Sequence, residues 1–380
     1  MSFFMVNVLL LFGGKSCENE ISILTGVFAY NLIDRAQFFP VPVYIHTDGK
    51  WYTSDKMGDL DTFKKGDFSS FERVIVSGGT LYEWKEKKGG GKLVKKCEIG
   101  VALNCCHGGL GEGGGVSAAM ALCDIPLASP DIAPSAVFLD KSLTKLLAKA
   151  LGVPTVDYFK VGESDYQKRG AFLLKNIGTR LGFPVVVKPA KLGSSIGISV
   201  AENEEEAKLA IEAALLLDDC VLIEKFLKTK RDINCAAYTL NGEIILSEPE
   251  EAASGAGIYS FSDKYVKPKP KTAKKLPLSK ETREKIRAYT RTLYKRMGFK
   301  GVVRMDFLLS EDKIYLGEVN TVPGSLAYYL FCERLTDAKA FFSDLIKEGL
   351  KKGEEKKILS TGVLRTVKGG AKRGNFAVRL

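Results

Sequence analysis

Residues 301–320 read GVVRMDFLLSEDKIYLGEVN. Two alternating runs, Gly301–Leu309 and Ile314–Val319, flank a polar turn, and this pattern predicts a β-hairpin. A hairpin of this length brings Asp306 and Glu318 to the same level, facing one way. Carboxylates grouped like this suit Mg²⁺, which takes one or two carboxylates together with waters and nucleotide phosphates. A polar strand face with an arginine–carboxylate pair explains the hairpin equally well.

A second feature is a strand that ends in a lysine and leads into a small, hydroxyl-rich turn. Residues 185–197 read VVVKPAKLGSSIG. Backbone N–H groups of such a loop cradle phosphate, and Lys188 at the strand end adds a positive charge. An ordinary strand-end lysine is the alternative, but the Gly193–Gly197 run behind it favours phosphate binding. The loop matches neither a Walker A nor a dinucleotide-binding motif.

A third segment, Val221–Leu227, reads VLIEKFL and predicts a buried strand that meets polar residues at its end. Its main-chain groups suit the edge of an adenine ring, and its carboxylate suits a ribose. The segment therefore adds candidate base and ribose contacts to the phosphate loop.

Together these segments resemble the ATP-grasp fold and, within it, the D-alanine–D-alanine ligase family. The resemblance runs from about Val8 to about Leu350. It rests on seven segments that follow the family's order: Leu11–Ser22, His107–Gly114, Leu139–Lys141, Lys188–Gly197, Asp263–Tyr265, Arg304–Asp306 and Glu318–Gly324. One such segment is a weak indication, whereas seven in order are a strong one. The resemblance implies an α/β (α+β ATP-grasp) fold, in which a parallel-sheet domain precedes two subdomains that sandwich the nucleotide.

The resemblance also implies that ATP phosphorylates a carboxylate and that an amine then attacks the acyl phosphate. Asp306, Glu318 and Asn320 would hold two Mg²⁺ ions, or Mn²⁺ in their place, that bridge the ATP phosphates. Arg304 would stabilise charge on the acyl phosphate and on the tetrahedral intermediate. Gly324 would add a backbone N–H to that oxyanion hole.

The other implied roles are phosphate, base, ribose and amino acid contacts. The nucleotide contacts are Lys141, Lys188, Ser194, Ser195, Glu224, Lys225, Leu227 and Asp232. The amino acid contacts are His107, Lys264, Tyr265, Tyr329 and Leu330, and the catalytic residues include Glu18 and Ser194. Glu18 would fix the amine of the first substrate, although it also fits a helix cap. The loop with Lys264 and Tyr265 is predicted to be an active-site lid, with a solvated charged loop as the alternative.

The sequence departs from the family at several positions. Gly113 and Ser117 stand where the family usually has aspartate and glutamine. Asp232 stands where a ribose-binding glutamate is usual, and its shorter chain still accepts hydroxyl groups. The largest departure is Tyr329. It stands near the position at which the family has a serine, and that serine helps to bind the carboxylate of the second substrate. The ATP half of the site therefore matches the family, whereas the second-substrate half is remodelled.

The chain divides into three predicted parts. Residues 1–128 alternate strands with helices, which predicts a parallel sheet with ligands beyond the carboxyl ends of its strands. Residues 129–228 form the central ATP-grasp subdomain, and residues 229–380 form the carboxy-terminal one with a basic tail of flexible composition. The Lys/Gly-rich stretch Trp84–Lys96 is predicted to be a mobile surface loop. Predicted helices are Glu20–Leu32, Asp140–Ala150, Glu202–Leu217, Lys280–Met297 and Ala338–Lys352.

Composition favours a cytoplasmic enzyme. The 380 residues are 45% hydrophobic and hold no apolar stretch long enough to span a bilayer. The apolar start Ser2–Phe12 resembles a signal-peptide core, but it lacks preceding basic residues and is predicted to be a first strand. Eight cysteines without a disulfide rhythm fit reduced thiols. The net charge of +11 sits largely in lysine clusters without an aromatic ladder, which favours solvated surfaces over nucleic acid.

The sequence therefore predicts a ligase that joins D-alanine to D-alanine with ATP, giving D-alanyl-D-alanine, ADP and phosphate for peptidoglycan precursors. The first alternative is a related ligase whose second substrate is D-serine, a D-hydroxy acid or another amine. The second is a non-ligating ATP-binding protein with a regulatory or scaffolding role. A complete set of Arg304, Asp306, Glu318 and Asn320 argues against the latter. The resemblance also allows a homodimer.

Overall fold

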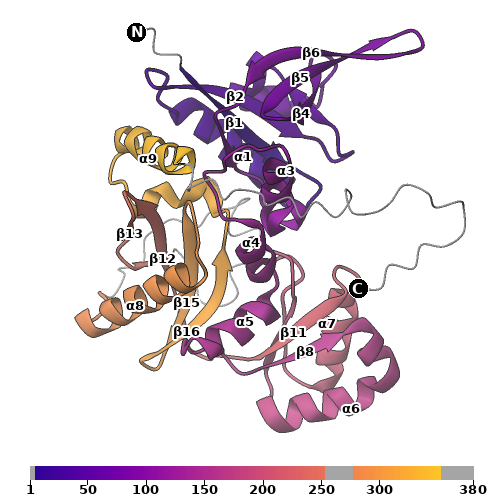
Figure 1. The fold of residues 1–380 in the computed structure, drawn as a ribbon. Coiled ribbons are helices and arrows are strands. Elements are labelled where there is room, and N and C mark those ends of the chain that lie inside the picture. Colours follow the sequence, from indigo (N-terminus) through magenta and orange to yellow (C-terminus); the bar gives the residue numbers. More distant parts are fainter. Residues whose placement is uncertain (1–4, 253–276, 352–380) are drawn as a thin grey trace, which may run out of the picture. The chain divides into compact units, whose positions relative to one another are not determined.

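The strands of the amino-terminal part form a seven-stranded mixed sheet, shown in indigo and purple in Figure 1. The structure, a computed structural model, describes residues 5–252 and 277–351, and those up to Leu350 belong to one compact unit. The strand order is β6-β5-β4-β3-β2-β1-β7. The strands are β1 (Val6–Gly13), β2 (Phe38–Ile45), β3 (Trp51–Thr53), β4 (Glu72–Ser77), β5 (Thr80–Lys87), β6 (Gly90–Glu98) and β7 (Val101–Asn104). The helices are α1 (Asn19–Leu32), α2 (Leu60–Lys64) and α3 (Val116–Leu122).

The expectation of parallel pairing holds for β1 with β2 and with β7, and it fails for the other strands of this sheet. Short turns join β2 to β3, β4 to β5 and β5 to β6, whereas parallel strands need a crossover of about a dozen residues or more.

The prediction of a mobile loop at Trp84–Lys96 is wrong. These residues belong to the β5–β6 hairpin, in which Trp84 pairs with Leu93. A two-residue turn closes the hairpin, and Gly89 adopts a φ of +89° there, a conformation that glycine tolerates. The high glycine and lysine content therefore belongs to an exposed hairpin.

The central part contains a four-stranded sheet of order β10-β9-β11-β8. Its strands are β8 (Tyr158–Gly162), β9 (Val185–Pro189), β10 (Ser199–Ala201) and β11 (Cys220–Lys225). Two long helices pack on it, α6 (Glu163–Leu181) and α7 (Glu204–Leu215), with Ile177 and Ile211 fully buried between helices and sheet. The helices α4 (Ile132–Leu139) and α5 (Lys141–Ala150) precede it. The sequence predicted α5 and α7, and it gave no prediction for α6.

The carboxy-terminal part contains the predicted hairpin. It is formed by β15 (Val303–Ser310) and β16 (Lys313–Asn320) in a sheet that also holds β12 (Arg231–Leu240), β13 (Glu243–Leu246) and β14 (Glu250–Glu251). Asp306 lies directly opposite Glu318, as predicted from the strand lengths. The helices α8 (Lys280–Arg296) and α9 (Ala338–Leu350) also match their predictions to within two residues at their starts and ends. No helix among the described residues is long and apolar enough to cross a membrane.

Candidate active site

A cleft of about 710 Å³ of open space collects residues from all three parts of the chain. Eight of the predicted site residues line it: Glu18, His107, Lys141, Ser194, Arg304, Glu318, Asn320 and Gly324. Nine other described site residues lie outside this lining. Lys188, Ser195, Glu224, Lys225, Leu227 and Asp232 lie on or near β9, β11 and β12, Asp306 lies on β15, and Tyr329 and Leu330 follow β16. Lys264 and Tyr265 fall outside the described residues.

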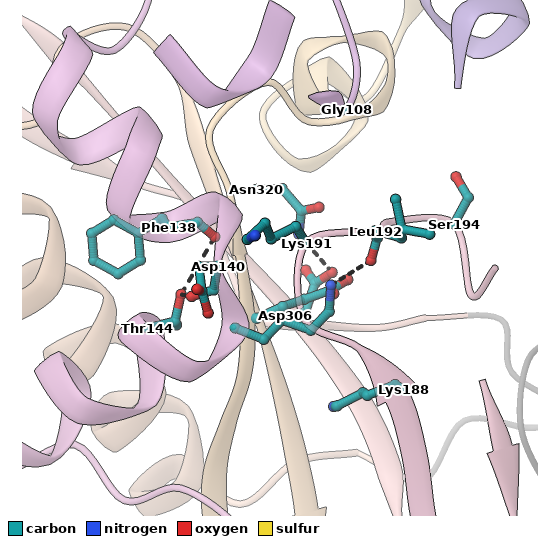
Figure 2. Close-up of polar contacts among 12 residues, drawn as sticks. Gly108, Phe138, Asp140, Thr144, Lys188, Lys191, Leu192, Ser194, Asp306 and Asn320 are labelled. Atoms are coloured by element: carbon teal, nitrogen blue, oxygen red, sulfur yellow. Dashed lines mark hydrogen bonds and ion pairs between the residues drawn. The ribbon is translucent and has the colours of Figure 1, made fainter. Parts of the chain in front are cut away.

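The hairpin places charged side chains on one face because residues two apart along a strand point the same way. Arg304 donates two hydrogen bonds to Asp306, from Nε to Oδ1 at 2.7 Å and from Nη2 to Oδ2 at 2.8 Å. The side-chain amide of Asn320 donates to Asp306 Oδ2 at 3.0 Å, and Figure 2 shows this pair beside the Leu192 loop. The Asp306 carboxylate is thus held in one orientation.

The hairpin offers oxygen ligands of the kind that Mg²⁺ prefers, two carboxylates and an amide. Within residues 5–252 and 277–351, no group of three or more His, Cys, Asp and Glu side chains is placed to hold a metal. Two carboxylates and an amide leave room for waters and phosphate oxygens around such an ion. The Glu318 side chain is 35% exposed and lies 3.8 Å from Lys141 Nζ.

Arg304 is a partly buried cation of the cleft, with a side chain that is 16% exposed. Burial alone lowers its pKa, but the charge of Asp306 raises the pKa of Arg304 well above its ordinary value. Its third nitrogen, Nη1, donates to the Tyr329 hydroxyl at 3.1 Å. Arg304 therefore stays charged and links the hairpin to the segment that follows Gly324.

The loop after β9 contacts Glu18. Ser194 donates a hydrogen bond from Oγ to Glu18 Oε1. A Cβ atom on Gly193 or on Gly108 would lie 2.6 Å from Glu18 Oε2, so a side chain at either position would displace this carboxylate. Glu18 precedes α1, but its side chain makes no capping hydrogen bond, so the helix-cap alternative is wrong.

Two lysines with predicted phosphate contacts lie on different elements of the central part, Lys141 on α5 and Lys188 on β9. Lys141 opens α5, which starts there because the Asp140 side chain caps it by accepting from the backbone N–H of Ser142 at 2.7 Å. The Lys141 ammonium donates to the Leu192 carbonyl at 2.5 Å and so contacts the loop after β9. Lys188 instead forms an ion pair of 2.8 Å with Glu224 on the neighbouring strand.

Glu224 is buried between two lysines. Its carboxylate lies 2.8 Å from Lys188 Nζ and 2.7 Å from Lys145 Nζ, and the residue is only 4% exposed. Burial alone raises the pKa of Glu224, but the two lysine charges outweigh it and lower the pKa to about 2. The carboxylate thus faces the two lysines. Its contact with a ribose stays a prediction.

Glu112 is a site residue that the sequence prediction missed. It lines the cleft and accepts three backbone N–H bonds, from Gly108 at 2.9 Å, from Thr321 at 3.1 Å and from Val322 at 3.2 Å. Burial raises the pKa of Glu112 to about 7. Glu112 therefore connects the segment His107–Gly114 to the loop after β16. A lone carboxylate among glycines was the only signal of this role in the sequence.

Two family models match the chain and together cover most of it. The model described as D-ala D-ala ligase N-terminus matches residues 7–130, and the one described as D-ala D-ala ligase C-terminus matches residues 147–351.

Curated relatives match over nearly the whole chain. The D-alanine–D-alanine ligase of Thermosipho melanesiensis is 32% identical over 366 residues, which cover 95% of this chain and 99% of the relative. The D-alanine–D-alanine ligase of Chlorobaculum tepidum is 31% identical and covers 93% and 98%.

Solved structures have the same fold. The D-alanine–D-alanine ligase of Helicobacter pylori superimposes with a TM-score of 0.73 at 27% identity, covering 91% of this chain and 98% of that one. The VanG D-Ala:D-Ser ligase of Enterococcus faecalis superimposes with a TM-score of 0.71 at 22% identity, covering 91% and 99%, and at that identity it supports the fold alone. The chain therefore belongs to the D-alanine–D-alanine ligase family, whose members are ATP-dependent carboxylate–amine ligases with the ATP-grasp fold.

Proposed function

We propose that this chain joins two D-alanine molecules, with ATP converted to ADP and phosphate, to supply D-alanyl-D-alanine for peptidoglycan precursors. The observation that carries the proposal is the cleft in which Arg304, Glu318 and Asn320 face Glu18 and Ser194. It combines a cationic group, oxygen ligands for a divalent ion and a carboxylate suited to an ammonium group. A protein that only binds nucleotide has no need of this combination.

In the first proposed step, a carboxylate oxygen of the first D-alanine attacks the γ-phosphorus of ATP, and ADP leaves. Glu18 accepts hydrogen bonds from the ammonium of this substrate, while Ser194 holds the Glu18 carboxylate and the phosphate loop together. Lys141, Lys188 and Ser195 bind phosphate oxygens. Two Mg²⁺ ions, or Mn²⁺ in their place, held by Asp306, Glu318 and Asn320 would neutralise phosphate charge.

In the second proposed step, the neutral amine of the second D-alanine attacks the acyl carbon, and phosphate leaves. Arg304 and the backbone N–H of Gly324 stabilise the negative charge that develops on the acyl oxygen. Both residues line the same cleft. Since Arg304 is already oriented by Asp306, little reorganisation accompanies the charge development.

The rest of the proposed nucleotide site lies on β11, on β12 and on the segment between them. Lys225 and Leu227 flank the base, and Glu224 and Asp232 complete the ribose and phosphate surroundings. His107, Lys264, Tyr265 and Leu330 complete the amino acid sites. The proposed domains are residues 1–128, 129–228 and 229–380.

We place the enzyme in the cytoplasm, as a monomer or homodimer that does not bind nucleic acid. All eight cysteines are free thiols, which fits a reducing compartment. Several lysines of the exposed hairpin pair with carboxylates, as in Lys95–Glu98 at 2.7 Å and Lys85–Glu83 at 3.3 Å, so part of the positive charge is neutralised locally. Light scattering of the purified chain tests the oligomeric state.

The direct test of the proposed function measures phosphate release from ATP with a panel of D- and L-amino acid pairs, and mass spectrometry identifies each product. D-alanine alone is expected to give D-alanyl-D-alanine. ATP turnover without a dipeptide product, or with L-amino acids only, would overturn the proposal.

Nucleotide binding has a separate readout in thermal unfolding. Adding ATP with Mg²⁺ is expected to raise the melting temperature, because a ligand that binds the folded state at about 100 times its Kd stabilises that state by about 2.7 kcal/mol. ADP and a non-hydrolysable analogue should act in the same direction. An unchanged melting temperature with all three nucleotides contradicts nucleotide binding at this site.

A second candidate function, ligation of D-alanine to another small acceptor, is favoured by Tyr329. Tyr329 stands near the sequence position at which the family has a serine. Its hydroxyl accepts a hydrogen bond from Arg304 Nη1 at 3.1 Å. A phenol narrows the second subsite, so small acceptors are expected to react and bulky ones to lose activity.

Tyr329→Ser is therefore expected to change the KM of the second substrate severalfold while the KM of ATP stays nearly constant, because only one subsite changes. Steady-state kinetics with each substrate varied in turn measure both constants. Equal changes in the two constants would contradict this assignment.

A further inference from the structure

The segment after Gly324 contains three consecutive residues in the left-handed region. Ser325, Leu326 and Ala327 have φ values of 50°, 51° and 52°. Residues with a Cβ atom visit this region singly and seldom in succession, because Cβ approaches the following carbonyl oxygen. Other contacts must therefore hold the turn, here named the left-handed turn 325–327.

The first contact is a buried hydrogen-bond relay. The backbone N–H of Ser325 donates to Thr25 Oγ1 at 3.1 Å, and Thr25 Oγ1 lies 2.7 Å from His107 Nε2. Thr25 is 2% exposed and His107 is 4% exposed, so water does not compete for these groups. Burial lowers the pKa of His107 to about 4, which leaves the ring neutral and able to accept the Thr25 proton.

The second contact comes from the same face of α1. Phe28 follows Thr25 by three residues, a spacing that puts both side chains on one side of a helix. The Phe28 ring packs against the Tyr328 ring with 4.7 Å between their centroids. The helix thus holds the start of the turn through Thr25 and its end through Phe28.

The position of the turn determines where the next side chain points. Tyr329 lies two residues after Ala327, and its hydroxyl accepts from Arg304 Nη1 at 3.1 Å. Leu326 and Ala327 are 2% and 0% exposed, so the turn packs into the core and cannot shift without disturbing it.

We propose that Thr25 is a positioning residue for the second-substrate subsite: its hydroxyl, together with His107, fixes the left-handed turn 325–327 and thereby places the Tyr329 hydroxyl on Arg304. The inference rests on the proposed function, because it assigns Tyr329 to the acceptor side of that reaction. Thr25 touches no substrate and acts only through the turn.

The test compares Thr25→Val, which keeps the shape and removes the hydroxyl, with Thr25→Ser, which restores it. Thr25→Val is expected to raise the KM of the second D-alanine about tenfold, equivalent to about 1.4 kcal/mol, with the KM of ATP unchanged within about twofold. Thr25→Ser should return the constant to near the wild-type value. The matched control is Thr53→Val, since Thr53 is also buried and its hydroxyl donates to the Pro42 carbonyl at 2.7 Å.

A second readout does not depend on activity. With 3-fluorotyrosine at position 329, the ¹⁹F resonance is expected to shift in Thr25→Val and to stay in place in Thr25→Ser and Thr53→Val. Phe28→Leu, which loosens the other contact, should shift the same resonance, so the test survives if Thr25→Val does not fold.

The outcomes separate this inference from the proposed function. A wild-type enzyme that forms no dipeptide overturns the proposed function, and the ¹⁹F shifts still decide whether Thr25 positions Tyr329. A wild-type enzyme that forms dipeptide, with Thr25→Val leaving both the acceptor KM and the resonance unchanged, overturns the inference. Equal effects of Thr25→Val and Thr53→Val overturn it as well, because a loss of stability alone would explain them.

Discussion

Replacing Glu318 by glutamine is expected to lower turnover about a hundredfold or more while the fold survives. Glu318 lies opposite Asp306 on the hairpin and lines the cleft, so it is placed to share a divalent ion with nucleotide phosphates. The amide keeps the shape but removes a negative charge from the ion's surroundings. Losing about 3 kcal/mol of charge stabilisation in the transition state corresponds to about a hundredfold in rate.

Turnover of Glu318→Gln is measured at saturating Mg²⁺, together with its thermal unfolding. The side chain is 35% exposed and its contact with Lys141 is 3.8 Å long, so the melting temperature should change little. Glu311→Gln is the matched control, because Glu311 is exposed in the turn of the same hairpin. Near wild-type turnover in Glu318→Gln would contradict the metal assignment.

The hairpin could be predicted because its signals are local. Alternation with a period of two fixes which side chains share a face, and a short polar turn fixes the register. The register set by the turn alone would place Asp306 opposite Gly317, and a register shift between Asp306 and Phe307 brings Asp306 opposite Glu318 and Arg304 opposite Asn320. This shift was not predicted. The same reasoning misjudged residues 84–96, because a glycine-rich, highly charged composition was given more weight than the strand pairing that the alternation allows.

Long-range contacts could not be predicted. Glu112 binds the N–H groups of Thr321 and Val322, 209 and 210 positions away along the chain, and Thr25 accepts from Ser325, 300 positions away. Burial decides the charge state of such groups, and a single sequence gives no measure of it. The same holds for Lys145, whose contact with Glu224 needs α5 to pack against β11.

Replacing Lys188 by methionine is expected to have the second large effect, on ATP binding and on stability together. Lys188 is predicted to bind phosphate, so its loss leaves phosphate oxygens without a charged donor and should raise the KM of ATP at least about tenfold. It also forms a 2.8 Å ion pair with buried Glu224. Glu224 then keeps only Lys145, at 2.7 Å, so the melting temperature should fall, but by less than the loss of a sole partner causes.

The two effects separate in a double variant. Glu224→Gln in the Lys188→Met background removes the carboxylate that still pairs with Lys145, which is itself 1% exposed. Stability should fall further, because a buried lysine charge is then left without its carboxylate. The KM of ATP should stay high, because the phosphate oxygens still lack their donor. If the KM of ATP instead returns to the wild-type value in the double variant, Lys188 serves only to balance Glu224, and its assignment to the phosphate site is wrong.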